Sequence, residues 1–235
     1  MKMAVVDSRI PRPCAERLRK LGYGLIAMPE FPSLQSPVSA HPDMLLFFAD
    51  RAVLCHKDYL AIAEAQIEEI SKCGYDVIIT DENIAPQYPR DVLLNALRIG
   101  NKIYCKADAA SELILEFARE RGYTVRNVKQ GYAKCSVCTL GSNAAITSDP
   151  TLCRAMREDG IDVLSISAGS VALIGYDTGF IGGCSGEDGD KIYFSGNISL
   201  HPDGERIVEF CEKHKKTAVS LSDEPFTDVG TIFFI

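Results

Sequence analysis

One phrase occurs four times along the 235-residue chain. Each copy joins a charged amphipathic segment to a glycine, a large apolar residue and a run rich in aliphatic residues. The copies read KLGYGLIAM, KCGYDVIIT, ERGYTVRNV and EDGIDVLSI. Their glycines, Gly22, Gly74, Gly122 and Gly160, stand where a helix would end, at the position after the C-cap that favours a positive φ. Each phrase therefore predicts a helix that turns directly into a strand.

The residues before these phrases complete a repeating unit. Apolar residues recur at spacings of three and four, as at Leu60, Ala63, Ile67 and Ile70, which is typical of a helix with one buried face. Two short apolar runs precede each helix, and they read DMLLFF and RAVLCH, DVLLNAL and NKIYCK, AKCSVCTL and NAAITS, and SVALIGY and GFIGGC. The unit is therefore strand, strand, helix, strand, and four copies follow one another.

Polar residues mark where the helices are expected to begin. Asp58, Asp108 and Asp149 are predicted near helix starts, and Asp149 precedes Pro150, which suits an N-cap followed by proline at the first helical position. The tripeptide at 201–203, His-Pro-Asp, predicts the start of a further helix.

A fifth unit forms only when the two ends of the chain are joined. GTIFFI at the C-terminus supplies its first strand, MKMAVVDS its second, and residues 12–21 its helix before GLIAM. The sequence therefore predicts an α/β fold, a closed five-bladed β/α propeller in which the N- and C-termini share one blade. It is expected to be a single domain, 1–235. The predicted ββαβ repeats are 226–235 with 1–28, then 43–80, 91–128, 132–167 and 170–222. The alternative is an open Rossmann or flavodoxin sheet, but no GxGxxG or GxxxxGK[ST] phrase follows a strand.

Three segments interrupt the repeat. Pro29 to Pro42 and Asn83 to Pro89 are rich in proline and polar residues and are predicted to be surface connections. In the fourth unit, GGCSGEDGDKIYFSGN is interpreted as an acidic hairpin inserted between the second strand and the helix. It lacks the alternating ligands and distal glutamate of a calcium-binding EF-hand.

Composition bears on partners and location. The formal net charge is −7, from 32 acidic and 25 basic residues spread along the chain, so nucleic acid is not an expected partner. No apolar stretch is long enough for a membrane span, and no export signal is recognised, so a cytoplasmic protein without membrane contact is expected. No phosphate-loop or dinucleotide motif is present, and no cofactor is predicted; homo-oligomerisation stays open.

The nine cysteines are expected to be reduced and buried, because their number is odd and most lie in apolar runs such as RAVLC and NKIYC. Cys135 and Cys138 form the one tight pair. If they lie on a strand, residues three apart point to opposite faces, and no second pair supplies further ligands. No metal site is predicted.

Two segments carry a resemblance to a known superfamily. GYAKCSVCTLGSNAAITSDP resembles the segment of dimethylarginine hydrolases that carries a His-Leu-Lys-Ser phrase. AVSLSDEPFTDVGTIFFI resembles their C-terminal segment, which ends in Asp-Gly-x-x-Thr-Cys. The chain is thus similar to the pentein superfamily of guanidino-group-modifying enzymes, over roughly the last hundred residues, while the first half matches only in pattern.

The resemblance implies a cysteine thiolate that attacks a guanidinium carbon, a histidine that moves protons, and carboxylates that hold the cationic group. Carried onto this sequence, the place of the cysteine falls on Phe233 and that of the histidine on Tyr132. Neither residue can do that chemistry, so the resemblance implies a degenerate active site. Lys134 and Asp228 do match polar positions of the pattern. Another branch of the same fold, which resembles ribosome anti-association factors, is catalytically inert and binds through its surface.

Five residues are predicted to converge on a central pocket from the first strands of the blades. They are Asn95, Lys134, Cys135, Asp177 and Asp228. Lys134 sits in the apolar frame YAKCSV and is expected to need an anionic partner, which Asp177 or Asp228 would supply. This arrangement is either an internal ion pair that closes the ring or a ligand pocket for a small zwitterion or anion. Cys135 is either a nucleophile with a lowered pKa or an inert buried thiol.

The remaining candidates are histidines and glycines. His56, His201 and His214 are expected to be solvated or to cap helices, and His41 falls in the proline-rich segment. The glycines of 179–186, GFIGGCSG, indicate either tight packing between blades or backbone amides that hold an anion.

Three functions remain open at this level. The first is a pentein-fold protein that binds a small polar metabolite in its central pocket without the catalytic cysteine and histidine. The second is an active hydrolase or transferase on guanidino or related substrates, with Cys135 as a relocated nucleophile. The third is a non-catalytic protein-interaction ring.

Overall fold

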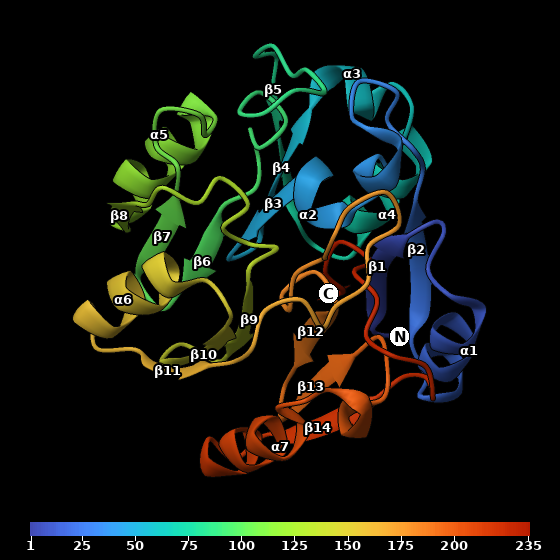
Figure 1. Ribbon diagram of the computed structural model, residues 1–235. Coiled ribbons are helices and arrows are strands. Elements are labelled where there is room, and N and C mark those ends of the chain that lie inside the picture. Colours follow the sequence, from blue (N-terminus) through green and yellow to red (C-terminus); the bar gives the residue numbers. More distant parts are fainter.

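The computed structural model describes all residues from Met1 to Ile235 and contains five three-stranded sheets arranged about a common centre (Figure 1). The strands of these sheets are β15 (Phe233–Phe234), β1 (Met3–Asp7) and β2 (Gly24–Met28); β3 (Leu46–Ala49), β4 (Ala52–His56) and β5 (Asp76–Thr80); β6 (Leu97–Ile99), β7 (Lys102–Cys105) and β8 (Thr124–Asn127); β9 (Val137–Leu140), β10 (Ala144–Thr147) and β11 (Asp162–Ser165); and β12 (Ser185–Asp188), β13 (Lys191–Phe194) and β14 (Thr217–Ser220). In every sheet the first strand is antiparallel to the second and the second is parallel to the third. Five sheets with the same arrangement of strands fit the five predicted repeats.

Helices connect the second and third strands and lie on the outside of the sheets. They are α1 (Arg12–Lys20), α3 (Lys57–Leu60) with α4 (Glu64–Lys72), α5 (Glu112–Arg121), α6 (Pro150–Glu158) and α7 (Gly204–Lys213). A short helix α2 (Pro42–Leu45) and two 3₁₀ turns, Ser36–Val38 and Ile198–Leu200, complete the secondary structure. In each sheet, the helix between the second and third strands is the crossover connection that two neighbouring parallel strands require.

Glycines end four of the helical segments as predicted. Gly22, Gly74, Gly122 and Gly160 have φ values of 92°, 90°, 74° and 81°. A residue with a Cβ is strained in this left-handed region, which explains why glycine recurs at the step from helix to strand.

A helix begins next to Asp58 and next to Asp149, and one begins shortly after Asp108, as predicted, although only Asp149 is a cap. Asp149 caps α6, since its Oδ1 accepts the backbone N–H groups of residues 151 and 152 at 2.8 Å each. Asp58 and Asp108 do not cap: His56 Nδ1 caps α3 and the hydroxyl of Ser111 caps α5. The carboxylate of Asp108 is bound instead by the neighbouring lysine ammonium at 2.5 and 2.7 Å, which leaves the cap to the buried serine.

The first two strands of the fourth repeat were placed wrongly. SVALIGY and GFIGGC are not strands; the hairpin that was interpreted as an insertion forms β12 and β13, and its tight turn contains Gly189 with φ 60°. The apolar residues Val171 and Ile181 are buried because the loop between β11 and β12 folds onto the core beside Ile166. An apolar run in the sequence indicates burial, but it does not by itself distinguish a strand from a buried loop.

The segment 29–42 is also less exposed than expected for a surface connection. Phe31, Leu34, Ala40 and His41 are buried, and Phe31 and Leu34 pack in one apolar cluster with residues of the first and second sheets. This segment therefore contributes to the interior.

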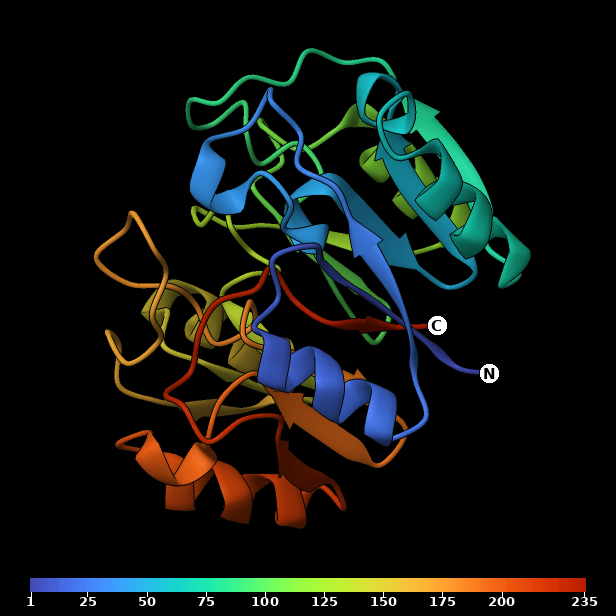
Figure 2. The same cartoon turned by 90° about the vertical axis from the view of Figure 1, so that its right-hand side faces the viewer.

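The two ends of the chain meet in one sheet, as predicted for TIFFI and MAVVD. Val5 pairs with Phe233 and Ala4 with Phe234, and Met3 and Ile235 exchange two backbone hydrogen bonds of 2.9 Å. Figure 2 shows the two termini side by side.

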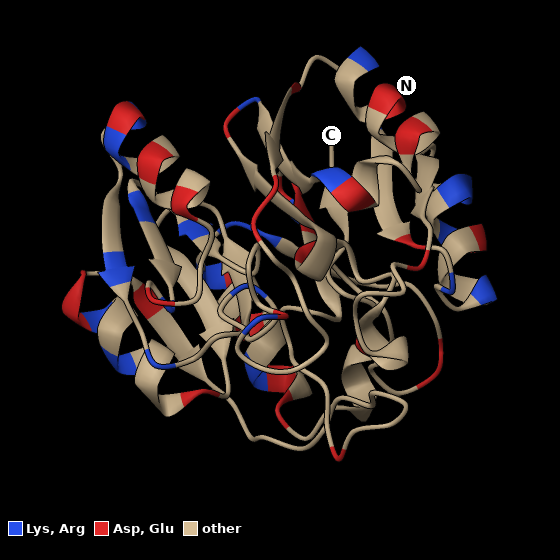
Figure 3. Ribbon diagram, turned by 90° about the horizontal axis from the view of Figure 1, so that it is seen from above, with Lys and Arg blue, Asp and Glu red and all other residues tan.

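The surface carries mixed charge. Acidic and basic positions are interspersed along the outer helices, while most strand positions at the centre are neither (Figure 3). None of the helices combines the length and the apolarity that a bilayer crossing requires.

Candidate functional site

A cavity of about 130 Å³ lies beneath the loop between β11 and β12. We call it the Asp228 cavity. Its walls are formed by Val38, His41, Met44, Tyr132, Cys135, Leu173, Tyr176, Thr178, Phe180 and Asp228. The rings of Tyr132 and Phe180 stack with their centroids 6.0 Å apart, so the cavity has aromatic walls and few polar groups.

His41 lies between two carboxylates. Its Nε2 is 3.7 Å from Asp7 Oδ2 and its Nδ1 is 3.7 Å from Asp228 Oδ1, and all three side chains are buried. Asp7 has a second partner, because Arg9 donates to its two oxygens at 3.1 and 2.8 Å. The charge of Asp7 is therefore compensated.

Asp228 has only an imidazole and two backbone amides as partners. It accepts the N–H of Phe180 at 2.9 Å and that of Gly230 at 3.0 Å. Burial raises the pKa of Asp228 to about 6, with His41 opposing the rise and the nearby carboxylate of Asp43 adding to it. No lysine or arginine nitrogen lies within 4 Å of this carboxylate.

Two further carboxylates are buried next to lining residues, although neither lines the cavity itself. Asp43 accepts the Thr231 hydroxyl at 2.7 Å, and Asp91 accepts the Tyr132 hydroxyl at 2.5 Å. In each carboxylate the other oxygen, Oδ1, has no hydrogen-bond partner. Burial raises the pKa of Asp91, against the effect of the tyrosine hydroxyl. Neither carboxylate forms an ion pair.

Asn95 fixes the backbone beneath the cavity. Its Oδ1 accepts the N–H of Lys134 at 2.8 Å, and its Nδ2 donates to the carbonyl oxygen of Asp43 at 3.0 Å and contacts Cys135 Sγ at 2.9 Å. With 1% of its surface exposed, the amide is a structural link between two segments and does not line the cavity.

Cys135 lines the cavity with a protonated thiol. Burial raises its pKa well above the usual value, and the carboxylates of Asp43 and Asp228 raise it further. A thiol in such surroundings is a poor nucleophile, because only the thiolate attacks. No three histidine, cysteine or acidic side chains lie where they could share a metal ion.

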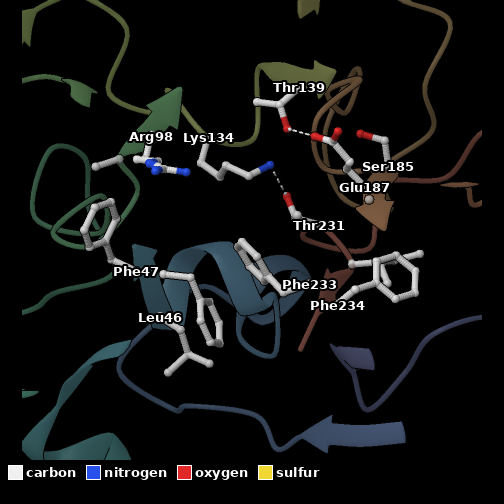
Figure 4. Close-up of a pocket in the computed structure, with 14 residues that line it drawn as sticks. Leu46, Phe47, Arg98, Lys134, Thr139, Ser185, Glu187, Thr231, Phe233 and Phe234 are labelled. Atoms are coloured by element: carbon white, nitrogen blue, oxygen red, sulfur yellow. Dashed lines mark hydrogen bonds between the residues drawn. The ribbon is translucent and has the colours of Figure 1, made fainter. Parts of the chain in front are cut away.

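Lys134 faces the opposite way from Cys135. It lines a second cavity of about 200 Å³, which we call the Lys134 cleft, whose walls come from β3, β6, β9, β12 and β15 and their flanking residues (Figure 4). Its lining residues are Leu46, Phe47, Phe48, Ala96, Arg98, Lys134, Thr139, Ser185, Gly186, Glu187, Thr231, Ile232, Phe233 and Phe234. Lys134 Nζ donates to Thr231 Oγ1 at 3.1 Å, and that hydroxyl donates to Asp43 Oδ2, so Thr231 separates the cleft from the carboxylates.

The predicted ion pair of Lys134 with Asp177 or Asp228 is not formed. No carboxylate oxygen lies within 4 Å of Lys134 Nζ, and Asp228 is turned toward the cavity on the other side of Thr231. Asp177 is exposed in the loop between β11 and β12, since the run that was expected to be a strand is a loop. Of the five predicted residues, Cys135 and Asp228 meet in the cavity, Asn95 supports it, and Lys134 lies in the cleft.

The two positions carried over from the superfamily do not share a site. Tyr132 lines the Asp228 cavity, whereas Phe233 lines the Lys134 cleft, where its ring packs against Phe48 with centroids 4.7 Å apart. Tyr132 donates its hydroxyl to Asp91, and burial and that carboxylate raise its pKa, so it is no proton shuttle near neutral pH.

The glycine run packs tightly. A Cβ at Gly183 would overlap the carboxylate of Asp228, and one at Gly182 would overlap the carbonyl oxygens of Lys134 and Cys135. Tight packing explains these two glycines without an anion.

Sequence reasoning missed His41, Asp43 and Asp91 as site residues. Asp43 and Asp91 each begin an apolar run, DMLLFF and DVLLNAL, which was interpreted only as a strand. A carboxylate at the buried end of such a run is a signal that could have been used. His41 gave no signal, because it lies in a segment that looked exposed.

Several solved structures are similar to this one. A mutant of DDAH from Pseudomonas aeruginosa in complex with citrulline has a TM-score of 0.59 at 10% identity, and the match covers 94% of this chain and 91% of that one. SxtG, an amidinotransferase of Microseira wollei, has a TM-score of 0.56 at 10% identity, over 88% of this chain and 72% of that one. The agmatine deiminase of C. jejuni has a TM-score of 0.53 at 6% identity, over 94% and 75%. These likenesses show the pentein fold. Among curated proteins, no sequence matches the chain.

One family profile, described as a family of unknown function (DUF6873), matches residues 5–233, nearly the whole chain. The resemblance seen in the last hundred residues thus extends, as a fold, over all five sheets. The chain belongs to the DUF6873 family and has the fold of the pentein superfamily.

Proposed function

We propose that the protein binds a small organic cation of the guanidino or amino type in the Asp228 cavity. One observation carries this proposal: the buried carboxylate of Asp228 lines a cavity with aromatic walls and has no lysine or arginine partner. Two more buried carboxylates without such a partner lie next to lining residues, Asp91 at the Tyr132 hydroxyl and Asp43 near Asp228. A buried carboxylate without a cation costs several kcal/mol. A cationic ligand would remove that cost.

The walls of the cavity suit such a ligand. Tyr132, Tyr176 and Phe180 present aromatic rings, which attract cations through their faces. Asp228 lines the cavity, and its carboxylate can accept N–H groups of a bound cation, whereas Asp43 and Asp91 lie outside the lining and add negative charge near it. A planar group with two N–H donors suits a carboxylate, which can accept both.

The similar structures support the ligand class. One of them holds citrulline, and others are named for an amidinotransferase and an agmatine deiminase, so this fold accommodates small nitrogen-rich molecules. We also propose that the five sheets form a closed ring, since a closed ring would surround the cavity on all sides. The pairing of β15 with β1 supports this closure.

Catalysis by Cys135 is the second candidate. It is favoured by the position of the sulfur on the cavity wall, together with His41. The raised pKa of the thiol speaks against it, as do Tyr132 and Phe233 at the positions that the resemblance assigns to histidine and cysteine. Binding without turnover is therefore the better-supported function.

The test is a thermal-shift and calorimetry series with agmatine, arginine, methylguanidine and methylurea, the uncharged analogue of methylguanidine. We expect at least one cation to raise the melting temperature of the parent protein, and methylurea to have no effect, since binding to the folded state alone stabilises it. Asp228→Asn should abolish that shift. Asp177→Asn, which removes an exposed carboxylate of the neighbouring loop, should keep it. If none of the cations shifts the parent, or if Asp228→Asn responds as the parent does, the proposal is wrong.

Turnover is assayed in the same samples. Arginine, agmatine and methylated arginines should release no citrulline, carbamoylated product or amine above background. Turnover that Cys135→Ala abolishes would establish the catalytic alternative instead.

A further inference from the structure

The Lys134 cleft contains an ammonium group, that of Lys134, that has no anionic partner in the protein. Lys134 Nζ has one hydrogen-bond partner, the Thr231 hydroxyl, and lies 5.6 Å from the centroid of the Phe233 ring. An ammonium has three N–H donors, so two of them have no partner in the folded chain. Figure 4 shows the ammonium inside the cleft, with the Phe233 ring below it.

The acidic residue of the cleft does not compensate this lysine. Glu187 accepts Lys216 Nζ at 2.6 Å and the backbone N–H of Gly141 at 2.7 Å, so its charge is already paired. Arg98 supplies a second cation to the lining, and its one ion pair, with Asp50, is long at 3.4 Å and exposed. The cleft therefore has two cationic side chains, from β6 and from the segment before β9, and one neutralised carboxylate.

The remaining walls are apolar. Phe48 and Phe233 pack against each other, and Leu46 and Ile232 lie beside them in the lining. A site with cationic donors at one wall and aromatic rings at another is complementary to a molecule with a single anionic group on an apolar body. Inorganic ions would leave the apolar wall unused.

We propose that the Lys134 cleft is a second ligand site, which binds a small organic carboxylate. Lys134 donates two N–H groups to the carboxylate, Arg98 contributes charge from the neighbouring strand, and the rings of Phe48 and Phe233 hold the apolar part. This site is independent of the proposed cation site, because Thr231 and Asp43 lie between them and each site has its own lining.

The geometry of Thr231 adds a further observation. This β-branched residue has φ 66°, a conformation that costs free energy for a residue with a Cβ. The strained backbone places the Thr231 hydroxyl where it accepts a hydrogen bond from Lys134 Nζ and donates one to Asp43. This hydroxyl holds the ammonium within the cleft and away from the Asp228 cavity.

The experiment measures binding of benzoate, butyrate and inorganic phosphate to the parent protein by calorimetry and by ligand-observed NMR, at low and at moderate salt. We expect benzoate to bind more tightly than butyrate, phosphate to bind least, and the affinity for benzoate to fall with added salt. Lys134→Met should weaken benzoate binding at least tenfold. Lys129→Met, which removes an exposed lysine outside the cleft, should leave it unchanged.

Further variants keep the test decisive. Lys134→Arg should retain most of the affinity, and Arg98→Met should reduce it, so a failure of Lys134→Met to fold would not end the test. Asp228→Asn should bind benzoate as the parent does, which separates this site from the cation site. The proposal is overturned if benzoate does not bind, if Lys134→Met binds it as well as the parent, or if phosphate binds better than benzoate.

Discussion

The carboxylate of Asp228 is buried in the folded protein, and this burial makes the free energy of unfolding depend on pH. Because burial raises its pKa to about 6, the folded protein holds this proton more tightly than the unfolded chain, in which an aspartate titrates near pH 4. Its contribution to the free energy of unfolding is therefore fully present below about pH 4 and is lost as the pH rises through about 6.

We predict that this loss disappears in Asp228→Asn. The difference in unfolding free energy between parent and variant should shift in favour of the variant from about pH 4 to about pH 6 and then stay constant above about pH 7. Urea unfolding at a series of pH values measures it. Parallel curves over the whole range would mean that the carboxylate titrates normally in the folded protein.

At this scale the sequence predicts types of residue better than contacts. Lys134 was singled out correctly as an unusual cation among apolar residues, yet its partner is a hydroxyl, because the loop that carries Asp177 is not a strand. The burial of His41 beside Asp7 and Asp228 depends on segments far away in the chain, and local patterns do not encode such contacts. Asp43 did carry a local signal, as the first residue of a buried apolar run.

At the scale of the elements, the start of α6 shows a local sequence signal, an aspartate followed by a proline, that forms the predicted N-cap. Asp149 accepts two N–H groups of the first turn, which would otherwise lack partners inside the helix. The signal was readable because cap, proline and helix are adjacent in sequence.

Replacing this cap should be measurable. Asp149→Ala is predicted to lower the free energy of unfolding by about 1 kcal/mol, the usual cost of losing an aspartate cap. Asp58→Ala serves as the control, since Asp58 stands in the first turn of α3 but accepts no backbone N–H there, and its effect should stay within about 0.5 kcal/mol. Chemical denaturation of both variants provides the comparison, and equal losses would contradict the assigned cap.

The repeat explains why the elements were largely predictable. The step from helix to strand requires a left-handed residue, so glycine marks it in four copies. The first strands carry no such requirement, and in the fourth copy a buried loop was mistaken for them. Where backbone geometry demands one residue type the sequence is informative, and where only burial is needed it is ambiguous.

For the whole molecule, the joining of the chain ends is the most testable feature. Deleting residues 230–235 removes β15 together with the buried side chains of Thr231 and Ile232, and it leaves β1 as an open edge. We predict that this deletion lowers the free energy of unfolding by several kcal/mol, about what the lost buried apolar surface is worth. A calorimetric melting temperature equal to that of the parent would refute the shared sheet.

The pairing of β1 with β15 also bears on folding. Val5 pairs with Ile26 on one side and with Phe233 on the other, so the sheet that contains β1 is completed only by the last strand of the sequence. Every other sheet draws its strands from one contiguous stretch and closes short loops, which is fast, whereas this contact must close a loop of almost the entire chain. Without β15, one edge of β1 would carry unpaired backbone groups, and exposed strand edges favour aggregation, so the contact between the two ends protects the sheet as well as completing it.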